Sequence, residues 1–336
     1  MKVVIVGGVA GGMSAATRLR RLDEKAEIVV FEKGGYVSFA SCGLPYYIGG
    51  VIGERSALLP QSPDGLRERF ALDVRVGQEV LAIDRTAHTV TVRDHWSGVD
   101  YAQHWDHLVL SMGAEAVVPP VPGLERAHVL RDVVDADAIV QAAEHARTAV
   151  VIGAGFIGLE MAENLHARGL SVALVEQAGQ VLSPLDPEMA QPVAAHLRAH
   201  GVEVRLGTRV AQVGPDTVVL GDGAALPADL VVLAAGVRPR SGLAVAAGLA
   251  IGPGGGILVD ASLRTSDPRV YAVGDVAEKI DAVSGQPVLI PLAGPANRQG
   301  RLAADSIMGR PARDTDGYGT AVVGVLGLHR RGHRLE

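Results

Sequence analysis

Cysteine is nearly absent from this sequence, since Cys42 is the only one among its 336 residues. A lone cysteine cannot form a disulfide within the chain, so the protein does not require an oxidising compartment. Long apolar runs are also lacking: Leu230–Val237 is among the longest, far short of the roughly 18 residues that a membrane-spanning helix needs. The net charge of −6 gives no general attraction to nucleic acid or to an anionic membrane. We therefore expect a soluble, cytoplasmic protein without a nucleic-acid or membrane partner.

The composition is that of a globular protein with a large core. Hydrophobic residues make up 48% of the chain and charged residues 20%, which excludes a disordered protein. At the usual domain size of about 100–200 residues, the length corresponds to about two domains.

One pattern of apolar runs and glycines begins at the first residues of the chain. The apolar run 2–6 leads through a glycine-rich turn, 7–12, into a helical stretch over 13–22. A second apolar run, 27–31, then ends at Glu32. The order of strand, glycine turn, helix, strand and acid predicts a βαβ unit that binds a dinucleotide.

The same pattern returns in the middle of the chain. The apolar run 149–152 leads into the glycine turn 153–158 and a helical stretch to residue 167, and the run 171–175 ends at Glu176. In such units the glycines let the backbone approach a pyrophosphate, the helix N-terminus offers free N–H groups to it, and the acid accepts from ribose hydroxyls. The first copy has Val9 where the motif has its middle glycine. Glycine-rich turns without a ligand are the alternative, and the occurrence of the pattern twice, with the second copy complete, argues against it.

A third predicted strand ends at an acidic residue. The segment 265–276 predicts a strand that ends in Gly274 and Asp275, and a carboxylate there is well placed to hold the ribityl hydroxyls of a flavin cofactor. The apolar runs 108–113 and 230–236 each end at a glycine. We interpret these two runs as strands that cross between nucleotide domains, with buried strands followed by ordinary turns as the alternative.

From Met1 to about Ala321 the chain resembles the pyridine nucleotide-disulfide oxidoreductase family. The resemblance implies an α/β fold of the glutathione-reductase type with two Rossmann-like dinucleotide-binding domains. Residues 1–113 plus 248–318 would bind FAD, and residues 114–247 would bind NAD(P)H. Residues 319–336 would be a remnant of a C-terminal α+β dimerisation domain, which relatives continue for roughly another hundred residues. We therefore expect a truncated chain, in which the homodimer of the family cannot be assumed.

The resemblance also assigns cofactor residues. Those implied for FAD are Gly7, Gly8, Val9, Ala10, Gly11, Gly12, Glu32, Lys33, Val80, Ser111, Gly113, Arg131, Gly274, Asp275, Pro291, Leu292 and Ala293. Those implied for NAD(P)H are Gly153, Gly155, Phe156, Ile157, Gly158, Glu160, Glu176 and Gly236. Phe156 would be an aromatic gate over the flavin, or else a core aromatic behind the glycine turn. Glu176 repels a 2′-phosphate and therefore favours NADH, although NADPH stays open.

The segment 38–50 contains the cysteine and narrows the resemblance to one branch of the family. Two-cysteine members carry their second cysteine five residues on, where this chain has Tyr47, so the chain resembles the single-cysteine branch. That branch contains coenzyme A disulfide reductases, persulfide reductases, and NADH oxidases and peroxidases. The oxidases and peroxidases have a histidine where this chain has Ala10, and its first glycine turn is similar to that of the coenzyme A disulfide reductases.

The resemblance to coenzyme A disulfide reductases implies a set of substrate residues: Ser14, Arg18, Arg21, Ser38, Ser41 and Asn297. Phe70 replaces a lysine of that pattern, and Asn297 replaces a histidine. A solvated helix face is the alternative for Arg18 and Arg21. We expect no metal site, because His95, His104 and His107 lack ligand spacing.

The expected catalytic residue is Cys42, acting as a thiolate in NAD(P)H-dependent reduction of a disulfide. Its sulfur partner must come from outside the chain: coenzyme A, a persulfide sulfur, or an oxygen atom as sulfenic acid. The alternatives are an NADH oxidase or peroxidase, a reductase that passes electrons to a ferredoxin-like protein without Cys42, and a truncated flavoprotein remnant without activity.

Overall fold

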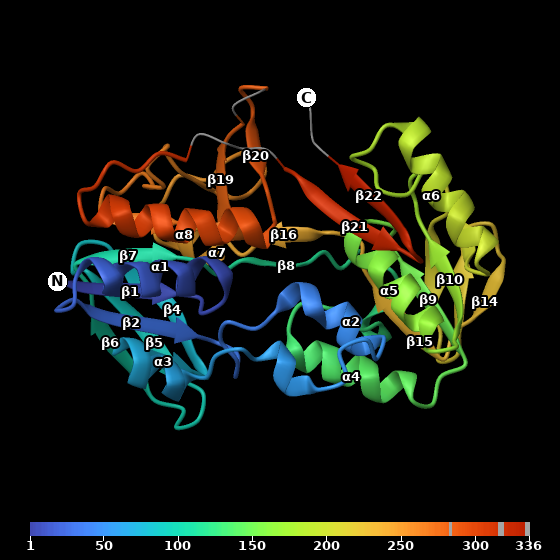
Figure 1. Ribbon diagram of the computed structural model, residues 1–336, viewed down its shortest axis with the longest axis horizontal. Helices are drawn as coiled ribbons and strands as arrows, with labels where there is room; N and C mark the ends of the chain where they lie inside the picture. The colour runs from blue at the N-terminus through green and yellow to red at the C-terminus, as the bar shows by residue number, and fades with distance from the viewer. Residues whose placement is uncertain (282–283, 315–318, 333–336) are drawn as a thin grey trace.

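The computed structural model describes residues 1–281, 284–314 and 319–332. Two parallel sheets lie in its two halves, one on the left and the other on the right of Figure 1. The first has the order β18-β7-β1-β2-β3, with strands Val270–Ala272, His107–Leu110, Lys2–Val6, Glu27–Glu32 and Asp73–Val76. The second has the order β11-β10-β9-β15, with strands Glu203–Arg205, Ser171–Val175, Thr148–Ile152 and Leu230–Leu233. Every pairing within these two sheets is parallel. The predicted α/β class with Rossmann-like units is confirmed.

Both faces of the first sheet are covered, as a parallel sheet requires. Alternate side chains of β1 point to opposite faces: Val3 and Ile5 pack under the helices, and Val4 and Val6 pack under antiparallel strands. The helices are α1, α3 and α8, over Ala10–Leu22, Pro63–Phe70 and Ala293–Ile307. The antiparallel sheet consists of β4, β5 and β6, over Gln78–Asp84, Thr89–Asp94 and Asp100–His104. The short helix α7, Gly242–Ala246, lies on the same side.

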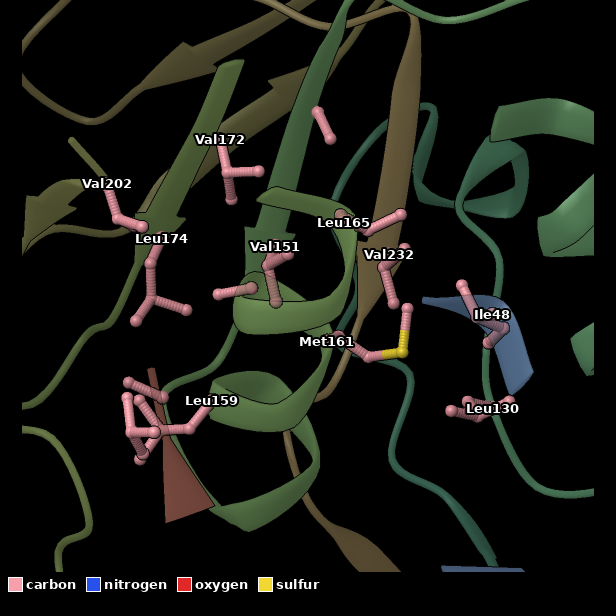
Figure 2. Packing of buried hydrophobic residues seen from close by; sticks show 14 of the residues in the cluster. Ile48, Leu130, Val151, Leu159, Met161, Leu165, Val172, Leu174, Val202 and Val232 are labelled. Atoms are coloured by element: carbon pink, nitrogen blue, oxygen red, sulfur yellow. The ribbon is translucent and has the colours of Figure 1, made fainter. Parts of the chain in front are cut away.

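The second sheet has its own core. Figure 2 shows Val151 of β9 and Val232 of β15 beside Met161 and Leu165 of the helix above them. The helices on this face are α4, α5 and α6, over Val133–Ala143, Phe156–Ala167 and Pro187–Ala199. Strands β12, β13 and β14 cover the other face, over Val210–Val213, Thr217–Leu220 and Ala225–Pro227.

A two-stranded ribbon lies where the chain passes between the two sheets. Strand β8, Ala114–Ala116, follows β7 and pairs antiparallel with β16, Val237–Pro239, which follows β15. The two apolar runs that end at glycine therefore lead into the same ribbon, which is compatible with the interpretation that they cross between nucleotide domains. We propose that the domain division lies here, with 1–113 and 248–318 on one side and 114–247 on the other; residues 315–318 lie outside the described part.

The remaining elements are short. They are the helix α2, Leu44–Ile48, the 3₁₀ turns Ser41–Gly43, Arg55–Leu58, Leu124–Arg126 and Gly274–Val276, and the strands β17, β19 and β20 over Ile257–Leu258, Ala277–Ile280 and Pro287–Leu289.

A last hairpin consists of β21, Ala321–Val325, and β22, Leu328–Gly332. The turn of this hairpin lies between α5 and α6, because the Leu326 N–H donates to Glu163 and the Leu326 carbonyl lies 3.0 Å from His196 Nε2. The strand predicted over 318–325 is thus present from Ala321, while Tyr318 and the tail 333–336 lie outside the described residues. Within those residues, no helix combines the length and the apolar character that crossing a bilayer requires.

Candidate dinucleotide sites and the Cys42 cavity

The two glycine turns have the same backbone geometry. Gly7 has φ +103° and Gly153 has φ +104°, in the left-handed region. A Cβ on Gly7 would lie 2.1 Å from the Ser111 carbonyl oxygen, and one on Gly153 would lie 2.3 Å from that of Ala234. Only glycine satisfies both conditions, so each turn is fixed by its first glycine.

The last glycine of each turn brings the helix against the preceding strand. A Cβ on Gly12 would lie 1.9 Å from the Gly7 carbonyl oxygen, and one on Gly158 would lie 1.8 Å from that of Gly153. The middle position is different, since a Cβ on Gly155 would meet no described atom within 4 Å. The equivalent residue of the first turn, Val9, is therefore sterically acceptable.

The N-termini of both helices can accept an anion. Val9 precedes α1 and Gly155 precedes α5, and within the described chain neither caps its helix with a side chain. Neither first turn carries an acidic residue. The first N–H groups of both helices are therefore free of side-chain acceptors and fit the pyrophosphate of a dinucleotide.

The two acids hold equivalent positions. One oxygen of Glu32 accepts from the Gly8 N–H at 2.8 Å and the other from the Gly34 N–H at 2.8 Å. Glu176 accepts from the N–H groups of Ala154 and Ala178, both at 2.7 Å. Each carboxylate is thus fixed against its own glycine turn, and each oxygen keeps a lone pair that a ribose hydroxyl can use.

Asp275 and Arg131 fit the polar part of a flavin dinucleotide. Asp275 follows β18, and its Oδ2 lies 3.5 Å from Arg131 Nη2. Burial raises the pKa of Asp275, and Arg131 opposes that rise. Arg131 Nε is buried and has no hydrogen-bond partner among the described residues, so this donor fits a polar group supplied by a cofactor.

Several other residues predicted for FAD lie around the first glycine turn. A Cβ on Gly11 would lie 3.0 Å from Ser111 Oγ and 2.9 Å from Val273 Cγ2, so the ends of β7 and β18 meet the start of α1. Gly8 and Gly12 flank this point, Gly113 ends the β7 run, and Gly274 precedes Asp275. Lys33 pairs with Glu79 at 2.8 Å, beside the buried Val80. Pro291, Leu292 and Ala293 lead into α8.

On the second unit, Phe156 is 36% exposed at the start of α5, which argues against a core position. Ile157 follows it, and Gly236 lies between β15 and β16 with φ +100°. Burial, followed by the charge of Glu163, raises the pKa of Glu160 to about 7. The assignments to the nicotinamide cofactor are therefore compatible with this structure and stay predictions.

Cys42 is exposed and lies in the 3₁₀ turn Ser41–Gly43, immediately before α2. It borders a cavity of about 410 Å³. The cavity is lined by Val9, Ala10, Met13, Ser14, Thr17, Ser38, Phe39, Ala40, Ser41, Cys42, Gln61, Leu66, Phe70, Ala293 and Asn297. Three residues predicted for FAD and four predicted for the substrate are thus brought together with the cysteine.

Two contacts shape the polar part of this cavity. Ser14 Oγ donates to Asn297 Oδ1 at 2.9 Å, which joins α1 to α8 across the lining. Ser38 has a left-handed φ of +50°, and its N–H donates to the Gly8 carbonyl at 2.9 Å. The segment that carries Cys42 is therefore tied to the first glycine turn.

The arginines of α1 lie outside the lining. Arg18 pairs with Asp305 of α8, with nitrogen–oxygen distances of 3.1 and 2.7 Å. Arg20 donates to main-chain carbonyls, among them that of Phe70 at 2.8 Å, and Arg21 is exposed. The lining residues carry no charged side chain apart from the ionisable thiol of Cys42.

Sequence reasoning missed several lining residues. Gln61 and Thr17 line the cavity, but neither belongs to a motif that could have indicated it, and Phe39 lies in the segment 38–50 without having been singled out. Tyr46, one turn after Cys42, was missed as well. Burial raises the pKa of Tyr46, and the charges of Glu160, Glu163 and Cys42 add to the rise, which places the start of α2 near α5.

The histidines of the segment 95–107 do not form a cluster. His95 Nε2 lies 3.0 Å from a carboxylate oxygen of Glu79, His104 ends β6, and His107 packs against Tyr271. In the described ranges, no group of three or more histidine, cysteine or acidic side chains could hold a metal ion.

Comparisons with known proteins agree with this geometry. The family model for pyridine nucleotide-disulphide oxidoreductase matches residues 1–300. A coenzyme A disulfide reductase of Staphylococcus haemolyticus is 35% identical over 92% of this chain and 70% of its own length. The structure of reduced Bacillus anthracis CoADR-RHD is 46% identical, with a TM-score of 0.96 over 98% of this chain. An NAD-dependent persulfide reductase from A. fulgidus is 38% identical, with a TM-score of 0.96 over 99% of this chain.

The chain spans 60% of the length of the Bacillus anthracis chain and 64% of that of the A. fulgidus chain. The family match covers most of this chain and includes both glycine turns, the two acids Glu32 and Glu176, and Cys42. This chain therefore belongs to the pyridine nucleotide-disulphide oxidoreductase family, and its cofactors are FAD and a nicotinamide nucleotide.

Proposed function

We propose that this protein uses NAD(P)H and FAD to reduce coenzyme A disulfide, or a related disulfide or persulfide, through Cys42. One observation carries the proposal: the exposed Cys42 borders the same cavity as Ala10 of the first glycine turn and Ala293 at the start of α8. A substrate sulfur in this cavity would lie between the thiol and the residues predicted to hold the flavin.

Cys42 provides the nucleophile of the proposed reaction. Its thiolate attacks one sulfur of the substrate disulfide, the substrate S–S bond breaks, and the first thiolate leaves and takes up a proton. Cys42 is then joined to the second half of the substrate. FAD, when bound, supplies the two electrons that NAD(P)H delivers as hydride. Those electrons and a proton break the mixed disulfide, release the second thiol, and return Cys42 to its thiolate form.

The partner for Cys42 must come from the substrate, because the chain has no second cysteine. Tyr47, at the position of the second cysteine in two-cysteine relatives, instead directs its hydroxyl toward Asp137 at 3.4 Å. Arg55 pairs with the same carboxylate at 2.7 Å. Tyr47 thus belongs to a contact between α2 and α4.

The neutral lining favours the uncharged part of a thiol substrate near Cys42. Gln61 and the pair formed by Ser14 and Asn297 offer hydrogen-bonding groups to an amide or hydroxyl. The phosphates of coenzyme A would then lie outside the cavity, and the exposed Arg21 at the end of α1 is the residue that we propose meets them. A persulfide would fill only the part nearest Cys42. Glu176 supports NADH as the preferred donor.

An NADH oxidase or peroxidase that forms a sulfenic acid at Cys42 is the second candidate. The position where such members of the family carry histidine is Ala10, and Ala10 lines the Cys42 cavity. The lining residues include no histidine to act as a proton donor to an oxygen leaving group. Disulfide chemistry is therefore the better-supported proposal.

Anaerobic NADH oxidation in the presence of coenzyme A disulfide tests the proposal, with Cys42→Ser as the matched variant. We expect turnover in the natural protein and a loss of at least about 1000-fold in Cys42→Ser, as expected when a covalent nucleophile is removed. Reduction of ferricyanide by NADH should persist in the variant, because it needs only the two nucleotide sites. Equal disulfide turnover in both proteins would contradict the proposal, and NADH consumption that requires oxygen would favour the oxidase.

A further inference from the structure

Asp137 makes a set of contacts that the chemistry proposed for Cys42 does not use. It lies where α2 and α4 pack side by side (Figure 1). Both of its carboxylate oxygens face Arg55: Nε lies 2.9 Å from each, and Nη2 lies 2.7 Å from Oδ2. A carboxylate held by the fork of a guanidinium is fixed in direction as well as in distance. The ion pair therefore joins the turn Arg55–Leu58 to α4 in one orientation.

The same ion pair holds both ends of the segment that carries the cysteine. Upstream of Cys42, Arg55 Nη2 donates to the Tyr36 hydroxyl at 2.8 Å, and the guanidinium lies 4.9 Å from the centre of that ring. Downstream of Cys42, the Tyr47 hydroxyl donates to Asp137 Oδ1 at 3.4 Å. A displacement of Asp137 would therefore be transmitted to both ends of this segment.

The turn Arg55–Leu58 also supports the residues on either side of the thiol. The Ala40 N–H donates to the Leu58 carbonyl at 2.8 Å, and a Cβ on Gly43 would lie 3.0 Å from Leu58 Cδ2. Leu58 itself is fully buried. Because Ala40 and Gly43 flank Cys42, a shift of this turn would shift the cysteine with it.

The helix α4 connects Asp137 to the residues predicted to hold FAD. Asp132 and Asp135 form a capping box at its start, and the Arg131 N–H donates to Asp135 Oδ2 at 2.8 Å. Arg131 Nη2 lies 3.5 Å from Asp275 Oδ2. Asp137 follows one turn into the helix, which is buried along one face. One capped and packed helix thus carries a predicted flavin residue at its start and the support of the cysteine segment one turn later.

We propose that Asp137 is a positioning residue, which through Arg55 sets the separation between the Cys42 thiol and the flavin. The proposal rests on the function proposed above, because it requires Cys42 to act beside FAD. Asp137 is not among the described residues that line the Cys42 cavity, so it acts on the reaction only through other residues.

The exposure of the ion pair separates positioning from stability. The side chains of Arg55 and Asp137 are 36% and 35% exposed, and pairs exposed to this degree contribute little to the free energy of unfolding. A misplacement of about 1 Å in an active site, by contrast, can lower a rate by up to about a hundredfold. Loss of the pair should therefore change the placement of the thiol before it changes the stability of the protein.

The charge-transfer absorbance between a thiolate and oxidised flavin tests the proposal, because it requires the two groups to be in contact. The purified holoenzyme is treated with dithiothreitol and desalted without oxygen, and its long-wavelength absorbance is titrated with pH until it is constant. The final value then reports the placement of Cys42 and not its ionisation, with Cys42→Ser as the baseline. In Asp137→Asn we expect less than about half of the natural absorbance, and a kcat about tenfold lower with the KM for NADH within about twofold.

Two further variants exclude a merely structural effect. Asp100→Asn removes the carboxylate of a comparable ion pair, in which Arg93 Nε and Nη2 each lie 2.8 Å from an Asp100 oxygen, and should leave absorbance and kcat unchanged. Arg55→Ala should lower both, and the double variant with Asp137→Asn should be no worse than Arg55→Ala alone, because the two residues act through one contact. The Asp137→Asn holoenzyme should melt at the natural temperature when FAD is in excess.

The outcomes separate this proposal from the function on which it rests. A natural absorbance in Asp137→Asn, an equal loss in Asp100→Asn, or additive losses in the double variant would overturn this proposal alone. A natural protein with neither the absorbance nor disulfide turnover would overturn the function proposed for Cys42, and this proposal with it.

Discussion

Gly49 lies so close to Asn164 that a Cβ on Gly49 would sit 2.0 Å from Asn164 Oδ1. Asn164 is buried in α5, and its Nδ2 donates to the Glu160 carbonyl at 2.8 Å. One turn later, Arg168 Nη1 donates to the Ile48 carbonyl at 2.8 Å. The helix that follows Cys42 is therefore held at its C-terminal end by the helix of the second glycine turn. This contact couples the position of the cysteine segment to the proposed nicotinamide site.

Gly49→Ala should disturb this contact. The added methyl group overlaps a buried amide, and we expect the free energy of unfolding to fall by about 1–3 kcal/mol. Gly53→Ala is the matched control, because a Cβ there would meet no described atom within 4 Å. Chemical unfolding of the two holoenzymes measures the difference. Equal losses in the two variants would show that the contact between α2 and α5 does not constrain the fold.

Substitution of the two predicted ribose acids, Glu32 and Glu176, should weaken the binding of different cofactors. Glu176→Gln loses a charged acceptor in the second unit, so we expect the KM for NADH to rise about tenfold and the discrimination against NADPH to fall. Glu32→Gln should leave the KM for NADH unchanged and lower the FAD retained per chain. Steady-state kinetics and the flavin absorbance of the purified variants separate the two effects. An FAD loss in Glu176→Gln instead would reverse the assignment of the two units.

Glu160 should make stability depend on pH. Burial raises its pKa from 4.5 to about 7, so the folded protein holds this proton more tightly than the unfolded chain does between those values. The free energy of unfolding contributed by Glu160 is therefore present below pH about 4.5 and is lost as the pH rises to about 7. Because the side chain is partly exposed, we expect a loss of about 1 kcal/mol.

Glu160→Gln removes this titration while keeping the shape of the side chain. The difference in unfolding free energy between pH 5 and pH 8 should therefore be smaller in the variant than in the natural protein. Urea unfolding at the two pH values measures it. The same difference in both proteins would mean that Glu160 does not titrate in this window.

Arg21 distinguishes coenzyme A from smaller sulfur substrates. If its guanidinium contacts phosphate, Arg21→Ala should raise the KM for coenzyme A disulfide by about tenfold and leave the KM for a small persulfide unchanged. Arg21→Lys keeps the charge and should recover part of the affinity. The natural protein measured at increasing salt provides a second readout, since a phosphate contact weakens with ionic strength. Equal effects on both substrates would contradict a phosphate contact.

The central strands and the second helix could be predicted closely because their apolar patterns are local. The run 2–6 coincides with β1, the run 171–175 coincides with β10, and the helix predicted up to residue 167 ends there. The first helix begins at Ala10 instead of at Met13, because Gly11 and Gly12 are poor helix formers and hid its first turn from the pattern. Gly12 is tolerated in the helix because it lets α1 approach β1 closely.

The surroundings of the sites could be predicted less well, because they depend on contacts between distant segments. Arg18 pairs with Asp305, which lies 287 residues further along the chain, and no local pattern indicates this contact. Its predicted role in substrate binding stays a prediction. Motifs identify residues that bind a cofactor directly, whereas residues such as Gln61 become visible only when the fold places them beside Cys42.

The most direct test of the proposed chemistry is the covalent state of Cys42. The protein is incubated with coenzyme A disulfide without oxygen, and the peptide that contains Cys42 is examined by mass spectrometry before and after addition of NADH. We predict a coenzyme A adduct on this cysteine that disappears when NADH is added. An unmodified Cys42, in a protein that still oxidises NADH with this substrate, would contradict the account.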